Sequence, residues 1–179
     1  SDEALAAHTS NWRLCEETAA AAGHTVSRDK WRVVSLAHVA RSREQAKKNV
    51  EYGLENFAQY FRDIATFPIV PPEIDDAYEY LTESGMAVIG DPDDAIRFIE
   101  KLLEGSGGFG LFLELAHNWA DYEATLEHFD LMARYVVPHF NGKNVQRRNS
   151  YDYSRRNREV FVGAAQAAVE HEIERHEKT

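Results

Sequence analysis

The sequence predicts an α/β protein with about three parallel strands, and the alternation of two residue patterns carries this prediction. Short apolar runs bounded by turn residues alternate with segments whose apolar residues recur at helical spacing. Such alternation is typical of βα units, whose strands form a parallel sheet. Three strands and their helices do not cover both faces of such a sheet. We therefore interpret the chain as the closing portion of a βα barrel whose opening portion is absent.

Three segments are predicted strands. Val33–Val39 is largely apolar on both parities, as expected for a strand that lies between helices and a barrel interior. Met86–Gly90 is a second, shorter apolar run. Phe109–Leu115 is almost wholly apolar and gives the strongest strand signal in the chain.

Six segments are predicted helices, from their composition and from the three- and four-residue spacing of their apolar side chains. They are Asp2–Ala22, Ser42–Ala65, Ile74–Glu83, Asp91–Leu103, Asn118–Val137 and Glu159–His176. Gly23 and Gly105 stand where helix ends are expected, and Asp91 followed by Pro92 is a strong helix start. Gly53 interrupts an apolar stripe that runs to Ile64, so we expect a close packing partner there.

Tyr122, Leu126, Phe129, Ala133 and Val136 mark the 118–137 helix by their spacing. The domain prediction assigns residues 1–140 to the barrel portion and 141–179 to a basic connector and a C-terminal helix. The basic stretch from Lys143 to Arg158 is interpreted as a solvated or acid-facing surface, with an anion-binding patch as the alternative.

Composition restricts the classes of function. The 179 residues carry a formal net charge of −10, which argues against general binding to nucleic acid or to an acidic membrane. No apolar run reaches membrane-spanning length. Cys15 is the single cysteine, so an intrachain disulfide is excluded and a cytoplasmic location is expected. Its helical spacing with Trp12 and Ala19 predicts a small core residue.

Two motif-like runs carry little chemistry. Gly105–Gly110 matches the dinucleotide pattern GxGxxG, but it follows a helix and opens a strand, which is the reverse of a phosphate-binding loop. His171 and His176 are five residues apart and diverge by about 140° around a helix, so no metal site is predicted there.

The candidate site follows from position. In a βα barrel, chemistry collects at the carboxyl ends of the strands. His38 ends the first strand, and Glu114, His117 and Trp119 lie at the end of the last. Glu114 is unusual because a carboxylate in an apolar strand needs a partner. We interpret the four residues as the lining of a flavin or substrate pocket, with purely structural roles as the alternative for each.

Three segments resemble a known protein family: Trp31–Ala46, Val88–Ala95, and Ser106–Gly110 continuing to Ala120. Together with Ala133–Phe140, they resemble the C-terminal half of bacterial-luciferase-like, flavin-dependent monooxygenases, in the subgroup of limonene and alkanal monooxygenases. The resemblance implies a TIM-type (β/α)8 barrel and reduced FMN supplied by a separate reductase. It also implies O2 as the oxidant and a small hydrophobic substrate held in a dry cavity.

The resemblance also implies limits. The family's main catalytic and flavin-binding residues lie in the half that precedes Ser1, so no catalytic residue is assigned and the isolated chain is expected to be inactive. The missing N-terminal half, or self-association into an oligomer, would cover the open sheet edges. The alternatives are a deazaflavin-dependent oxidoreductase of the same superfamily and a non-catalytic assembly module.

Overall fold

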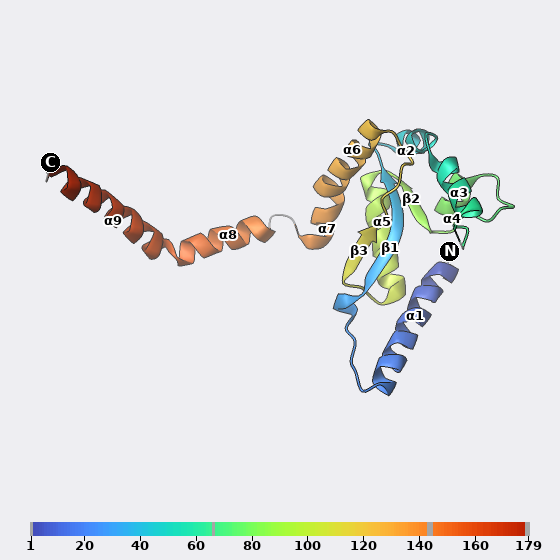
Figure 1. The fold of residues 1–179 in the computed structure, drawn as a ribbon, viewed down its shortest axis with the longest axis horizontal. Helices are drawn as coiled ribbons and strands as arrows, with labels where there is room; N and C mark the ends of the chain where they lie inside the picture. Colours follow the sequence, from blue (N-terminus) through green and yellow to red (C-terminus); the bar gives the residue numbers. More distant parts are fainter. Residues whose placement is uncertain (1, 66, 143–144, 178–179) are drawn as a thin grey trace. The chain divides into compact units, whose positions relative to one another are not determined.

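A computed structural model describes residues 2–65, 67–142 and 145–177. It divides the chain into two compact units, Ser1–Val137 and Pro138–Thr179, which are described separately. Three parallel strands and their flanking helices make up the first unit, shown in blue to gold in Figure 1. The predicted α/β class and parallel strands are thereby confirmed.

The strands are β1 (Arg32–Val39), β2 (Ala87–Gly90) and β3 (Leu111–Glu114), in the spatial order β2-β1-β3. The central strand β1 pairs with its two neighbours over different halves of its length. Its first half runs beside β3, from Arg32 opposite Leu111 to Ser35 opposite Glu114. Its second half runs beside β2, from Leu36 opposite Ala87 to Val39 opposite Gly90.

The helices of the first unit form in the predicted segments, with different bounds. Before β2 they are α1 (Asp2–Ala21), α2 (Arg43–Val50), α3 (Leu54–Asp63) and α4 (Ala77–Glu83). After β2 come α5 (Pro92–Ser106), α6 (Tyr122–Leu131) and a π-helical turn, Met132–Val136. A short 3₁₀ turn, Arg28–Lys30, precedes β1.

Ser42–Ala65 is two helices rather than one. A turn at Glu51–Gly53 separates α2 from α3 and changes the helix direction, as Figure 1 shows in teal. The reason is a tertiary contact. The Gly53 amide donates to the Trp119 carbonyl at 2.9 Å, and a Cβ on Gly53 would lie closer than 3.0 Å to the Asn118 carbonyl oxygen. The expected close partner therefore exists, whereas Ile64 is 70% exposed and not part of the core.

Helix α5 begins as predicted but ends later. The Asp91 side chain accepts from the Asp94 amide, and Asp94 accepts in return from the Asp91 amide, so both halves of a capping box are present. The helix continues through Gly105 to Ser106 and ends at Gly107, whose φ of 75° is left-handed. The predicted end at Gly105 was therefore wrong by one to two residues.

A buried core joins the sheet to α2, α3 and α4. Its members are Leu36, Ala40, Ala46, Val50, Leu54, Ala58, Val70, Ala77, Leu81, Ala87, Ile89 and Trp119. Helix α1 packs against α5, and Trp12 stacks on Trp31 at 5.0 Å between ring centroids. Cys15 is exposed, so its predicted place in the core was wrong.

One face of the sheet remains open. Val34, Leu111 and Leu113 are exposed by 56%, 46% and 37%, and pairing places all three on the same face. Leu115, the next residue of that parity, is exposed by 40%. The strand β3 is also shorter than the predicted Phe109–Leu115. An exposed apolar face is what an incomplete parallel sheet leaves uncovered.

The second unit consists of helices. It contains α8 (Val145–Arg156) and α9 (Arg158–Glu177), and α7 (Val137–Asn141) spans its start. The predicted basic connector is thus helical over α8, whereas Lys143 lies outside the described residues. Neither α8 nor α9 buries any side chain. No helix in the described ranges is long and apolar enough to cross a membrane.

Candidate functional site

The site is built at the carboxyl half of β1, on the edge that β3 leaves free. Beyond Ser35 the neighbouring chain no longer runs as a strand, and two histidine side chains take its place. His117 contacts the Ala37 carbonyl through Nε2 at 2.9 Å, and His128 Nδ1 accepts the Val39 amide at 2.8 Å. Side chains therefore satisfy backbone groups that a longer β3 would otherwise have paired.

These bonds fix the protonation pattern of both rings. His128 Nδ1 accepts a backbone N–H, so in the neutral ring the proton is on Nε2, which donates to the Glu114 carboxylate. His117 Nε2 donates to the Ala37 carbonyl, and its Nδ1 faces the Trp119 amide at 3.4 Å. Neither ring has a nitrogen left for proton transfer to a substrate.

The four predicted residues lie in one cluster with His128. Its ring stacks on His38 at 5.4 Å between centroids, while the His117 ring stacks on Trp119 at 3.9 Å. His38, Trp119 and His128 are almost fully buried, and the Glu114 side chain is 16% exposed. In the described structure, His38 and Trp119 thus lie beneath the surface, whereas His117 reaches a pocket.

Two residues of this cluster were missed by sequence reasoning. His128 lies on α6, beside a more obvious apolar stripe. The members of that stripe on α6 are in fact exposed, Tyr122 by 72%, Leu126 by 47% and Phe129 by 48%, whereas Val136 beyond the helix is buried. Asn49 donates its amide to His38 Nε2 at 3.2 Å, and its own oxygen accepts from Gln45. The available signal is Glu114: a carboxylate in an apolar strand needs a partner, but the sequence does not say which residue provides it.

The environment keeps the His38 and His117 imidazoles neutral. Burial, followed by the neighbouring His128 and His117, lowers the pKa of His38 from 6.5 to about 4, and Asp121 opposes this effect. Burial also lowers the pKa of His117, against the opposing effect of its bond to the Ala37 carbonyl. At neutral pH both rings are uncharged acceptors and donors.

We expect the first unit to lose stability between pH 6.5 and pH 4. Unfolded His38 takes up a proton near pH 6.5, but the folded ring stays neutral until about pH 4, so protons favour the unfolded chain across this window. A shift of this size corresponds to a loss of about 3 kcal/mol in unfolding free energy. Urea unfolding at several pH values measures it.

The control is His38→Gln, which cannot titrate. Its unfolding free energy should change less over the same pH window than that of the parent chain. An equal loss in the parent and the variant would show that other groups cause the acid sensitivity.

A pocket of about 400 Å³ lies beside His117, between α3 and the segment that follows β3. Its lining residues are Asn56, Phe57, Tyr60, Phe61, Leu115, Ala116, His117 and Asn118. Phe57 is central: its ring lies 4.8 Å from that of Phe61 and 6.2 Å from that of His117. The pocket is therefore mainly aromatic and has no acidic or basic lining residue apart from the neutral imidazole.

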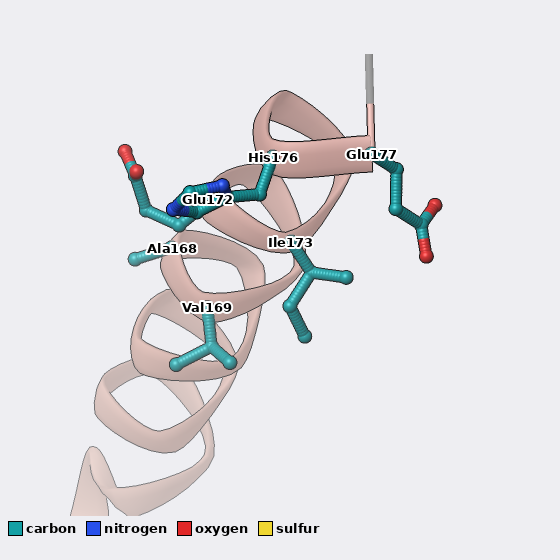
Figure 2. Close-up of a pocket in the computed structure, with 6 residues that line it drawn as sticks. All are labelled: Ala168, Val169, Glu172, Ile173, His176 and Glu177. Atoms are coloured by element: carbon teal, nitrogen blue, oxygen red, sulfur yellow. The ribbon is translucent and has the colours of Figure 1, made fainter. Parts of the chain in front are cut away.

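A larger hollow, about 630 Å³, lies along α9. Figure 2 shows that its lining residues all project from one helix. They are Ala168, Val169, Glu172, Ile173, His176 and Glu177. The described residues supply no opposing wall, so this hollow is a helix surface rather than a binding site. Across the described ranges, no group of three or more His, Cys, Asp or Glu residues has an arrangement that holds a metal ion.

The fold resembles that of a solved structure. A solved structure of similar fold is a type II Baeyer-Villiger monooxygenase, the oxygenating constituent of 3,6-diketocamphane monooxygenase from Pseudomonas putida, in complex with FMN. The TM-score is 0.57 at 24% identity, over 75% of this chain and 40% of that one. The fold is thus that of part of a luciferase-like barrel enzyme.

Two curated relatives make the assignment more particular. Limonene 1,2-monooxygenase of Rhodococcus erythropolis is 38% identical over 98% of this chain, and 4-hydroxyprotoasukamycin monooxygenase of Streptomyces nodosus subsp. asukaensis is 35% identical over 73%. The chain spans 44% and 36% of their respective lengths. No protein-family model matches it. The chain is therefore similar in sequence to part of two monooxygenases and similar in fold to part of a monooxygenase that binds FMN.

Two of the helix N-termini that follow the strands do not fit the phosphate group of FMN. A phosphate is bound by free N–H groups at a helix N-terminus or by cations. The three helices that follow β1, β2 and β3 are capped by their own side chains, Ser42, Asp91 and Asp121. Two of these caps, Asp91 and Asp121, are carboxylates, which repel a phosphate, so the N-termini of α5 and α6 offer it no site.

Proposed function

We propose that this chain forms the substrate-side wall of a monooxygenase that uses reduced FMN and O2 to oxygenate a small hydrophobic molecule. The observation that carries the proposal is the aromatic pocket beside His117, at the carboxyl ends of the strands. This is the end of a parallel βα sheet where ligands bind. The names of the two curated relatives, both monooxygenases, support the same reaction type.

In this proposal the residues that bind the flavin phosphate and the catalytic residues lie in sequence outside this chain. A separate reductase supplies the reduced flavin. The open face formed by Val34, Leu111 and Leu113 is where the remainder of the barrel packs. The isolated chain then has no catalytic activity of its own. The buried imidazoles hold the strand ends in place and exclude water from the interior of the site.

The test compares the 179-residue chain with a complete luciferase-like polypeptide that contains it. We expect the complete protein to consume O2 with reduced FMN, and limonene-like apolar substrates to raise the yield of oxygenated product. The isolated chain should show neither effect. A complete protein that binds no flavin and forms no oxygenated product would contradict the proposal.

The same assay addresses the alternatives. Substrate reduction or oxidation by hydride transfer, without O2 consumption, would indicate the deazaflavin-dependent class. An assembly module would show no turnover at all. The exposed apolar residues of α9, which include Phe161 and Ile173, are the observation that favours a role in assembly.

A further inference from the structure

We propose that the pocket between α3 and the segment after β3 selects uncharged, single-ring molecules that carry one oxygen substituent. This inference rests on the proposed function and adds the class of substrate and the residues that select it. Phe57, Tyr60 and Phe61 form the aromatic wall, and Asn56, His117 and Asn118 lie around it.

Size and shape are the first argument. About 400 Å³ is near the lower end of ligand pockets and has room for a single ring. The rings of Phe57 and Phe61 are tilted by 48° and lie 4.8 Å apart, while Phe57 meets Trp119 edge-on at 5.4 Å. Buried Trp119 therefore supports Phe57 from behind, and the wall keeps its shape when a flat or puckered ring packs on it.

Charge is the second argument. The lining residues include no Lys, Arg, Asp or Glu. Both nitrogens of His117 are engaged by the backbone, so the ring presents carbon atoms to the pocket. The whole chain carries a net charge of −10. An organic anion would therefore lose its hydration without gaining a cationic partner, and we expect carboxylates to bind more weakly than uncharged rings.

The polar handle is the third argument. In the part of the chain that the structure describes, the side-chain amides of Asn56 and Asn118 make no hydrogen bond, although both residues line the pocket. Each amide has donors for a carbonyl or hydroxyl oxygen. One such bond adds a modest amount of affinity but discriminates well between an oxygenated ring and a plain hydrocarbon.

Binding of cyclohexanone to the 179-residue chain, followed by saturation-transfer NMR, tests the inference. Cyclohexanecarboxylate is the charged comparison. We expect cyclohexanone to bind at least about fivefold more tightly than the carboxylate. Phe61→Ala should weaken cyclohexanone binding about tenfold, since it removes most of one wall. Asn118→Ala should weaken it about threefold.

Phe67→Ala is the matched control, because Phe67 is 81% exposed and lies outside the lining. Phe61→Leu retains much of the apolar volume and is a second variant in case Phe61→Ala does not fold. Circular dichroism checks that both variants are folded. Phe61→Leu should bind cyclohexanone more weakly than the parent chain and more tightly than Phe61→Ala. Equal effects of Phe61→Ala and Phe67→Ala, or equal binding of the two ligands, would overturn the inference.

These measurements need no flavin, so the two proposals fail separately. Selective binding of cyclohexanone without turnover in the complete protein would contradict the proposed function alone. Turnover of apolar substrates that Phe61→Ala leaves unchanged in the complete protein would contradict the pocket assignment alone.

Discussion

Replacing His128 by alanine should lower the unfolding free energy of the first unit by about 4 kcal/mol. The ring is 2% exposed and bonds on both sides. Its removal leaves the buried Val39 amide without an acceptor, deprives the Glu114 carboxylate of its donor, and opens a cavity beside His38. Urea unfolding followed by tryptophan fluorescence measures the loss, because Trp12, Trp31 and Trp119 all lie in the first unit.

His128→Asn separates these contributions. The asparagine oxygen can take the position of Nδ1 and accept the Val39 amide, but its side chain is too short to reach Glu114. We expect a loss between that of the alanine variant and zero. The control is His24→Ala, at an exposed position of the same unit, which should change stability by less than about 0.5 kcal/mol. Equal losses at positions 24 and 128 would contradict the strand-edge role of His128.

Gly53→Ala should destabilise the first unit by about 3 kcal/mol. The added Cβ would lie closer than 3.0 Å to the Asn118 carbonyl oxygen, and backbone atoms cannot move aside as a flexible side chain does. The hydrogen bond from the Gly53 amide to the Trp119 carbonyl holds the two segments at this distance. Relief of the clash must therefore separate α3 from the segment that carries His117 and Trp119.

The matched control is Gly163→Ala on α9, where a Cβ would meet nothing within 4 Å. It should leave the tryptophan-monitored transition unchanged and increase the helix content of the second unit slightly. A Gly53→Ala chain that unfolds at the same urea concentration as the parent would show that the two backbone segments are not in close contact.

Helix α6 shows where sequence reasoning fails. Its 118–137 segment was predicted to be helical, and the helix is present over Tyr122–Leu131, capped by Asp121. Leu126 and Phe129 of the obvious apolar stripe are exposed, while His128 and Leu131 are buried. The spacing of apolar residues predicts that the segment is helical. It does not determine which side of the helix is buried, because that depends on the neighbouring elements.

The candidate site also contains residues that the sequence identifies and residues that it does not. His38, Glu114, His117 and Trp119 were identified from their positions at strand ends, and the structure does bring them together. Their functional roles remain predictions. His128 and Asn49 were not identified, because both come from helices whose contacts with the strand ends depend on chain segments far apart in sequence.

The sequence by itself determined the local elements: apolar runs became strands, and Asp91, Pro92 and Ser42 started helices, because these preferences act between near neighbours along the chain. Only the tertiary structure decided the order β2-β1-β3, the break at Gly53 and the filling of the β1 edge by two histidines. These features depend on which backbone groups remain unpaired once the strands meet, and a buried N–H or C=O must find a partner from wherever the fold supplies one.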